Sequence, residues 1–403
     1  MVRKQRVIAV SILLALSLMV SLTPLSFAAG GGPGFHPLFS NLAKQNPRSP
    51  QVAGEARAPE GMTPVATGLN SPRGLTIGPD GGLYVAEGGV GGDACYQVDP
   101  GDPTFVLCVG STGSVTRIEN GQQDRIATGL PSMADPSGFA ASGPLRISWR
   151  PRDAFSVIIG LGADPAMRDA LAGLNPTFGD LGKLVRMNPA GSWSYMADVA
   201  GYEGVANPDG GVYDSNPYAV FSAPGRKRIV ADAGGNDLLQ VTNDGQISTL
   251  AVFPDRIVPY PPMFGGGEGP QQAVPTSVTQ GPDGAFYIGQ LTGFPFIPNA
   301  SNVYRLVPGG QPQVYAAGFS FIHDLTFGPD GSLYVLQFDD DLLSCEIFGV
   351  CTGGKLIKVD PSGTRTVIAR DLPYPGGVVV TKSGEIYMTL YSIFPGMGMV
   401  VRM

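Results

Sequence analysis

One short pattern recurs six times along the chain: an apolar or β-branched run, a tight turn and a second β-rich run. The clearest copy is Phe321–Asp340, in which the turn Gly328-Pro329-Asp330-Gly331 separates two such runs. In this turn Pro fixes φ, Asp bonds its own backbone and Gly accepts a positive φ. The other copies are Ser71–Glu87, Val274–Gln290, Tyr374–Leu390, Asn216–Asp232 and Gly143–Leu161. Six copies of one hairpin predict a repeat protein built from small β-sheets.

A second pattern alternates with the hairpin and supplies a third strand to each unit. It occurs at Ser114–Ile118, Lys183–Met187, Asp237–Val241, Asn302–Leu306, Lys355–Val359 and Met399–Met403. Each segment has apolar residues at alternate positions, as a strand with one wet face requires. In five of the six units a turn and a fourth short strand follow, such as Asp124–Thr128. Each unit is therefore predicted to hold four antiparallel strands.

The sixth unit lacks a fourth strand, because the sequence stops at Met403. A matching segment, Thr63–Thr67, stands at the other end of the chain and resembles Ile126–Leu130 at the end of the first unit. We therefore predict an all-β fold over residues 62–403, a six-bladed β-propeller of four-stranded antiparallel blades. The N-terminal strand would complete the C-terminal blade and remove the exposed sheet edges. A β-sandwich array is the alternative, and it would not need this strand.

The first 61 residues are predicted to lie outside the propeller. Residues 1–28 combine a basic end (Arg3, Lys4, Arg6), an apolar run (Val7–Val20) and a small-x-small cleavage signal (Ser26-Phe27-Ala28), as a signal peptide does. An uncleaved membrane anchor is the alternative, but the run is shorter than the roughly 20 residues that a span needs. Residues 29–61 are rich in Gly, Pro, Ser and Ala and predict a flexible linker. We expect a secreted or periplasmic protein with no membrane span after cleavage.

Charge and cysteine content agree with an exported protein. The net charge is −7, and loss of three basic residues with the signal peptide would make it more negative. Such a chain repels phosphate backbones, so no nucleic-acid partner is expected. Four cysteines in an exported chain favour disulfides over free buried thiols. Of the three pairings, we prefer Cys95–Cys108 and Cys345–Cys351, because each pair lies inside one insertion between strands.

The insertions indicate which face carries function. With the strands of a blade lettered a to d from the axis outward, the d–a and b–c connections emerge on one face. In this chain they are long and varied, whereas the a–b turns are short and alike. They include a predicted helix, Pro165–Ala172, capped by Asp164, and two Gly/Pro-rich loops, Ala200–Asn216 and Phe253–Ala273. Variable loops on a uniform scaffold usually carry function, so the site is predicted at the mouth of the central channel on this face.

Two positions per blade are predicted to point at that mouth, one near the start of strand a and one where strand b ends. The candidate ligand-binding residues are Arg73, Glu87, Arg146, Asn216, Tyr218, Asp232, Gln290, His323, Asp324 and Gln337. The candidate metal ligands are Glu87, Asn216, Asp232 and Asp324. Their oxygens would suit a hard divalent cation, so calcium is the candidate cofactor. Alternatively, these polar residues cap strand ends and hydrogen-bond one another around a water-filled channel.

His323 is the only histidine of the predicted propeller, and it is followed by Asp324. A histidine beside a carboxylate can act as a general base. Adjacent residues of a strand point to opposite faces, however, so a structural histidine that bonds a backbone carbonyl is the favoured interpretation. The chain contains no GxSxG, HExxH or GxxxxGK[ST] motif. No catalytic residue is therefore assigned.

Several distinctive segments resemble a known family. They are SPRGLTIGPDGGLYVAEGG, SNPYAVFSAPG, RIVADAGGNDLLQVTNDGQISTLAVFP, GAFYIGQLTGFPF, VYAAGF and DLTFGPDGSLYVLQ. Over roughly Met62–Met403 the chain resembles the ScyD/ScyE family of secreted repeat proteins, whose wider relatives are NHL-like and lactonase-like six-bladed propellers. The resemblance implies a secreted propeller and no established reaction. In lactonase-like propellers, carboxylates and amides at the channel mouth bind a divalent cation, and Glu87, Asn216 and Asp232 stand at roughly comparable positions.

Two functions from different classes remain open. The first is a binding module that takes a small molecule, a glycan or a protein at the loop-rich mouth. The second is a divalent-metal-dependent hydrolase or isomerase, lactonase-like, with its site in the same mouth. A quinone- or flavin-assisted oxidoreductase and a purely structural role are the remaining alternatives.

Overall fold

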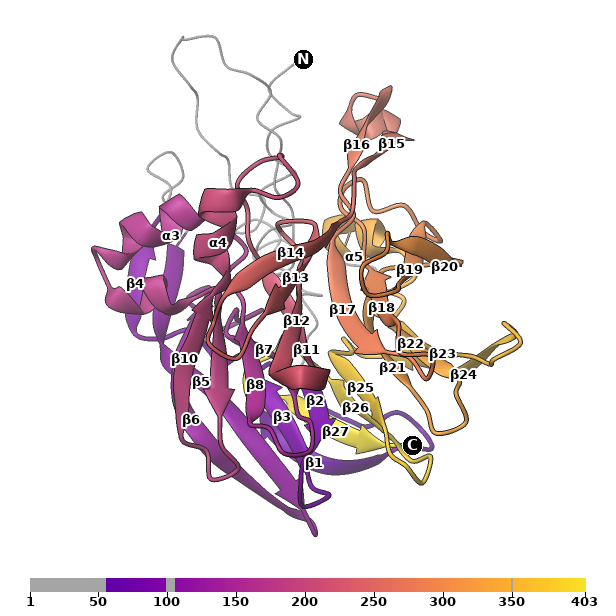
Figure 1. Cartoon of the computed structure of the whole chain (residues 1–403), viewed down its shortest axis with the longest axis horizontal. Helices are drawn as coiled ribbons and strands as arrows, with labels where there is room; N and C mark the ends of the chain where they lie inside the picture. Colours follow the sequence, from indigo (N-terminus) through magenta and orange to yellow (C-terminus); the bar gives the residue numbers. More distant parts are fainter. Residues whose placement is uncertain (1–55, 99–105, 349–350) are drawn as a thin grey trace.

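Six small antiparallel sheets stand around one axis in the computed structural model (Figure 1), which describes residues 56–98, 106–348 and 351–403. The predicted signal peptide and most of the predicted linker lie outside these residues. The first strand of each blade contacts the first strand of the next, and β25 of the sixth blade contacts β2 of the first. The predicted six-bladed β-propeller is therefore confirmed.

The first three blades are built as predicted, with one extra strand in the first. Blade 1 holds β2 (Pro72–Ile77), β3 (Leu83–Glu87), β5 (Val106–Glu119) and β6 (Gln122–Ala134), with the added β4 (Ala94–Gln97) on β5. Blade 2 holds β7 (Pro144–Ser148), β8 (Phe155–Ile159), β9 (Lys183–Met187) and β10 (Trp193–Asp198). Blade 3 holds β11 (Pro217–Ala223), β12 (Lys227–Asp232), β13 (Asp237–Val241) and β14 (Ile247–Val252).

The other three blades follow the same order, and the last one takes its outer strand from the start of the described chain. Blade 4 holds β17 (Pro275–Gln280), β18 (Phe286–Gln290), β19 (Ser301–Leu306) and β20 (Gln313–Phe319). Blade 5 holds β21 (Ile322–Phe327), β22 (Leu333–Gln337), β23 (Gly354–Val359) and β24 (Arg365–Leu372). Blade 6 holds β25 (Gly377–Val380), β26 (Ile386–Leu390), β27 (Gly398–Arg402) and β1 (Thr63–Leu69).

The closing strand pairs as the sequence predicts. β1 runs antiparallel to β27, with Thr63 opposite Arg402 and Leu69 opposite Gly398. Leu69 is fully buried and packs in one cluster with residues of blade 1 such as Leu75. The strand therefore satisfies the edge of blade 6 and also inserts a side chain between the last blade and the first.

The recurrent GPDG turn is explained by the bonds of its aspartate. Asp80 Oδ1 accepts the backbone N–H of Gly82 at 3.0 Å, and Gly81 has a φ of 84°. Asp80 Oδ2 accepts the hydroxyl of Tyr84 on strand b at 2.9 Å and Arg117 Nε on strand c at 2.6 Å. The repeated Tyr and the long polar residue of strand c are therefore partners of the turn aspartate, on the face away from the mouth.

Two of the predicted connections need correction. The helix α3 (Pro165–Ala172) forms as predicted, and the Asp164 side chain accepts the N–H of Ala166. The segment predicted as loop 200–216 begins instead with a second helix, α4 (Val199–Ala206), which Asp198 caps through the N–H of Gly201. The two glycines within this helix disfavour it locally, but Val199, Ala200 and Glu203 are buried on the propeller, and this packing offsets the poor propensity.

The second correction concerns loop 253–273, which contains a two-stranded arm. The strands β15 (Arg256–Pro259) and β16 (Glu268–Gln271) pair antiparallel, with the 3₁₀ turn η4 (Pro262–Phe264) between them. The arm rises from the same side as α3, α4 and α5 (Leu342–Phe348), opposite the C-terminus (Figure 1). The remaining 3₁₀ turns are η2 (Pro176–Asp180) and η3 (Pro224–Arg226).

Both predicted disulfides are present, Cys95–Cys108 and Cys345–Cys351. Residues 56–61, which were predicted as the end of the linker, lie against blade 6, where the hydroxyl of Tyr391 donates to the carbonyl of Arg57 at 3.2 Å. The packed part of the chain thus begins slightly before Met62. Within the described ranges, no helix is long and apolar enough to cross a membrane.

Leu69→Ala is expected to lower the free energy of unfolding by about 2–5 kcal/mol, because it leaves a cavity between the first and last blades. Thr67→Ala, at an exposed position of the same strand, should change it by less than about 0.5 kcal/mol. Urea denaturation of both variants measures the difference. Equal effects would show that β1 does not lock the ring.

Candidate functional site: the channel mouth

The inner strands start with an irregularity that the repeat pattern does not show. In strand a of five blades the pairing register shifts near its first residues, for example between Pro217 and Ala219 and between Ile322 and Asp324. The residues skipped at these two bulges are Tyr218 and His323. A β-bulge re-aims the side chains around it. As a result His323 and Asp324, although adjacent, are both buried and both bond residues of other blades.

Five of the ten candidate residues come together at the axis. We call them the axial network: Arg73, Arg146, Tyr218, His323 and Asp324. Arg146 of blade 2 reaches across to blade 5, where its Nη1 donates to Asp324 Oδ2 at 2.6 Å. Asp324 also accepts the backbone N–H of Val378 in blade 6 at 2.8 Å. Burial raises the pKa of Asp324 despite the opposing charge of Arg146.

His323 is held through both ring nitrogens. Its Nε2 lies 2.8 Å from the Tyr218 hydroxyl, and its Nδ1 lies 2.9 Å from the carbonyl oxygen of Gly376. A carbonyl only accepts, so Nδ1 carries the proton and Nε2 accepts the Tyr218 O–H. Burial, together with the charges of Arg73 and Arg146, lowers the pKa of His323 to about 3. His323 is therefore neutral at physiological pH and bonds a backbone carbonyl, as the sequence favoured, rather than Asp324.

Glycines in two blades leave room for this network. A Cβ on Gly74 would lie 2.3 Å from Cδ of Arg146, and one on Gly377 would lie 3.1 Å from its Nη1. Both glycines are in inner strands, on either side of the point where the first and last blades meet. The Arg146 side chain can cross the axis because these two positions carry no side chain.

The other five candidates hold connections in place, either within a blade or between neighbouring blades. Glu87 accepts the N–H of Asn70 at 2.6 Å and Nη2 of Arg125 at 2.9 Å. Asp232 accepts the N–H of Asn216 at 2.7 Å, and Gln337 accepts that of Ser320 at 3.1 Å. Gln290 Oε1 accepts the N–H of Asn302 at 3.2 Å, and Asn216 Oδ1 that of Leu161 at 3.2 Å. These bonds match the alternative in which the polar residues cap strand ends.

The four predicted metal ligands do not meet. Glu87 is engaged with Arg125 in blade 1, Asp324 with Arg146 at the axis, and Asp232 with backbone N–H groups of blade 3. Among the described residues, their carboxylates do not form a group with oxygens within 4.8 Å of one another. A shared calcium ion on Glu87, Asn216, Asp232 and Asp324 thus has no common point in this arrangement.

Above the axial network the mouth carries aromatic side chains that are not among the ten candidate residues. We call the following set the aromatic floor: Phe139, Phe294, Phe338, Tyr374 and Phe394. All five lie in d–a or b–c connections and belong to one apolar cluster. Phe338 stacks on His323 with ring centroids 5.2 Å apart, and Tyr374 packs edge-on against Phe394 at 4.9 Å. Phe139, Phe294 and Tyr374 are only half-buried, so their rings are partly open to solvent.

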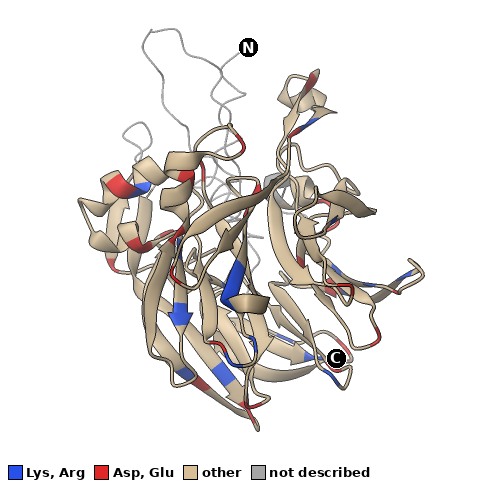
Figure 2. Cartoon of the chain, in the orientation of Figure 1, with Lys and Arg blue, Asp and Glu red and all other residues tan. Residues whose placement is uncertain are grey.

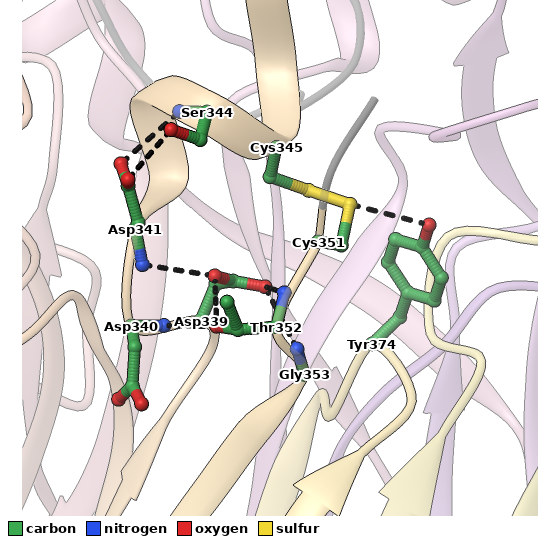
Figure 3. Close-up of a disulfide and its surroundings, with 9 residues drawn as sticks. All are labelled: Asp339, Asp340, Asp341, Ser344, Cys345, Cys351, Thr352, Gly353 and Tyr374. Carbon is green, nitrogen blue, oxygen red and sulfur yellow. Dashed lines mark hydrogen bonds between the residues drawn. A yellow bond between two sulfur atoms is a disulfide. The ribbon is translucent and has the colours of Figure 1, made fainter. Parts of the chain in front are cut away.

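The connection beside Tyr374 is braced by a disulfide and an aspartate (Figure 3). The Asp339 carboxylate accepts the N–H groups of Asp341, Thr352 and Gly353 at 2.9–3.0 Å. Cys351 Sγ lies 3.7 Å from the Tyr374 hydroxyl (Figure 3). Asp339 and the two sulfurs lie close enough to hold a metal ion, but both sulfurs are bonded to each other. This cluster therefore fixes the loop that positions Tyr374.

Two of the comparisons with known proteins give no match. No protein-family model matches the chain. No curated protein matches it either. The predicted ScyD/ScyE membership therefore stays a prediction.

The solved structures similar to this chain are six-bladed propellers of low sequence identity. Virginiamycin B lyase from Staphylococcus aureus is 14% identical, with 85% of this chain and 97% of that chain covered and a TM-score of 0.44. A PQQ-bound aldose sugar dehydrogenase from Streptomyces coelicolor is 10% identical, with 84% and 96% covered and a TM-score of 0.48. A gluconolactonase from Xanthomonas campestris is 12% identical, with 86% and 89% covered and a TM-score of 0.41.

Arg146→Met is expected to lower the free energy of unfolding by about 3–5 kcal/mol, because Asp324 would be left as a buried charge without its cation. Arg146→Met combined with Asp324→Leu should recover most of this loss. The control is Arg402→Met, which breaks an exposed pair with Glu385 and should cost under about 1 kcal/mol. Chemical denaturation measures the stability of all three variants. If Arg146→Met alone is as stable as the wild type, the inferred ion pair is contradicted.

His323 should make the fold acid-sensitive. The folded protein keeps His323 neutral down to a pKa of about 3, whereas the unfolded chain binds a proton near 6.5. Its contribution is therefore complete above pH 6.5 and is lost as the pH falls toward 3, at about 1.4 kcal/mol per pH unit. Denaturation of wild type and His323→Asn between pH 7 and 4 should give a shallower slope for the variant. Parallel slopes would contradict the neutral, buried histidine.

Proposed function

We propose that the protein is an extracytoplasmic binding module whose mouth receives a small molecule or glycan that presents a flat apolar face. The observation that carries the proposal is the aromatic floor. Three of its rings, Phe139, Phe294 and Tyr374, are partly exposed at the mouth and come from three different blade connections. Aromatic side chains that a rigid scaffold presents to solvent suit sugar rings and aromatic ligands.

The polar side chains that could catalyse hydrolysis are already hydrogen-bonded within the fold, which supports binding over hydrolysis. A general base needs a lone pair that faces its substrate. Nε2 of His323 accepts the Tyr218 hydroxyl instead, and Asp324 is bonded to Arg146 and to backbone N–H groups. The carboxylates of Glu87 and Asp232 are bonded within their blades. The side chains that a lactonase-like reaction would use are thus committed to holding the fold.

Rigidity of the mouth also supports this function. The Cys345–Cys351 disulfide and Asp339 fix the connection next to Tyr374. The arm formed by β15 and β16 places Tyr260 and Phe264 edge-on against Phe294, with ring centroids 5.2 and 4.9 Å away. A preorganised aromatic surface loses little conformational entropy when a ligand binds. Disulfide pairs at these positions also suit an oxidising, extracytoplasmic location.

The test is a screen of the purified protein on a glycan array and against a set of aromatic glycosides, followed by calorimetry with the compounds that bind. Phe139→Ala and Tyr374→Ala should each weaken binding about tenfold, because each removes one stacking face. Tyr315→Ala removes a similarly exposed ring on the outer strand β20 and should leave affinity unchanged.

Two outcomes would overturn the proposal. One is an affinity that Tyr315→Ala lowers as much as Tyr374→Ala does. The other is turnover of a lactone or ester by the purified protein that a substitution of Glu87 or Asp232 abolishes.

A further inference from the structure

Five acidic residues gather on the mouth side of blade 3, away from the axial network. We call them the acidic group: Glu203 on α4, Asp209 and Asp214 in the following loop, Asp232 at the end of β12 and Asp237 at the start of β13. Figure 2 shows acidic residues in the upper loops around α4. Glu203, Asp232 and Asp237 are each 1% exposed. A surface cluster of carboxylates is common, but one buried to this degree is not.

The turn between β12 and β13 brings the group together. A Cβ on Gly235 would lie 3.1 Å from Glu203 Oε2 and 3.5 Å from Cγ of Asp232. The next residue, Asn236, donates from Nδ2 to Asp209 Oδ2 at 3.1 Å. Carboxylates of α4, of the loop after it and of β12 therefore surround this turn, and glycine is required where they approach the backbone.

Part of the buried carboxylate charge has no hydrogen-bond donor. Neither side-chain oxygen of Asp237 has a hydrogen-bond partner, nor does Oε1 of Glu203, although all three atoms are buried. In the described part of the chain, no Lys or Arg forms an ion pair with Glu203, Asp209, Asp232 or Asp237. A buried carboxylate without donors or a counter-charge is strongly unfavourable. Such a group must be neutralised by protons or by a bound cation.

We propose that the acidic group binds a calcium ion, which ties α4 and loop 207–216 to the turn between β12 and β13. All of the available ligands are oxygens, as calcium prefers, and Asp237 and Oε1 of Glu203 offer oxygens that accept no hydrogen bond. The neighbouring acids and water can complete the six to eight ligands that calcium takes. Magnesium usually keeps several waters and is held by only one or two carboxylates, so it suits this group less. The site shares only Asp232 with the ligand set expected from the sequence, and it is independent of the mouth ligand proposed above.

The carboxylates must move to hold the ion. No three of them have oxygens within 4.8 Å of one another, which is the largest separation that ligands about 2.4 Å from one ion can have. Asp237 can supply this movement, because no hydrogen bond fixes its side chain.

The experiment is calorimetric titration and thermal unfolding of the full chain, purified in EDTA and dialysed, with CaCl₂ and separately with MgCl₂. We expect one calcium ion per chain and a rise in Tm of about 2 °C or more at 10 mM CaCl₂, with a smaller rise for magnesium. Asp237→Asn should remove the rise. In EDTA this variant should unfold at or above the wild-type temperature, because it loses a buried charge, so loss of folding cannot account for the result.

The matched control is Asp244→Asn, which changes an exposed carboxylate in the turn between β13 and β14 of the same blade and should keep the full rise in Tm. The proposal is overturned if the wild type shows neither binding heat nor a shift up to 10 mM CaCl₂, since the acids are then neutralised by protons alone. It is equally overturned if Asp237→Asn and Glu203→Gln both respond to calcium as the wild type does.

Discussion

Closure of the ring is the constraint on which the rest of the structure depends. A single four-stranded blade buries little on its own and exposes both edges of its sheet. Pairing of β1 with β27 satisfies the last open edge, and Leu69 fills the junction between blades 6 and 1. Once the ring is closed, side chains of opposite blades face each other at fixed distances. Arg146 and Asp324 are 178 residues apart in sequence and 2.6 Å apart across the axis.

The fold was predictable because its signals are local. The GPDG turn, the alternation of apolar residues and the caps of α3 each act within a few residues. None of them depends on contacts with distant parts of the chain. The helix α4 and the arm of β15 and β16 were not predictable in this way. Glycines and prolines dominate both segments, and their structure depends on packing against the propeller and on strand pairing that no short window reveals.

The candidate site was predictable only in part, for a different reason. Matched positions in the repeats correctly identified residues near the axis, such as Tyr218 and His323, but gave no partners for them. Strict alternation placed His323 and Asp324 on opposite faces, whereas a bulge of one residue brings both into the axial network. The role of Glu87 depends on Arg125 two strands away in the same blade, and the aromatic floor occupies connections that follow no repeat.

The axial network and the acidic group of blade 3 differ in how their buried charges are compensated. Three carboxylates elsewhere have a cationic partner: Asp324 has Arg146, Glu87 has Arg125, and Asp153 has Arg228. The buried Asp339 instead accepts three backbone N–H groups. Glu203 and Asp237 are buried to the same degree and have no cationic partner among the described residues. The other carboxylates named above are compensated by partners within the chain, whereas Oε1 of Glu203 and both side-chain oxygens of Asp237 are left to protons or to an external cation. Since α4 and the loop after it carry three of these acids, an external cation would order that part of the mouth as the disulfide orders the connection beside Tyr374.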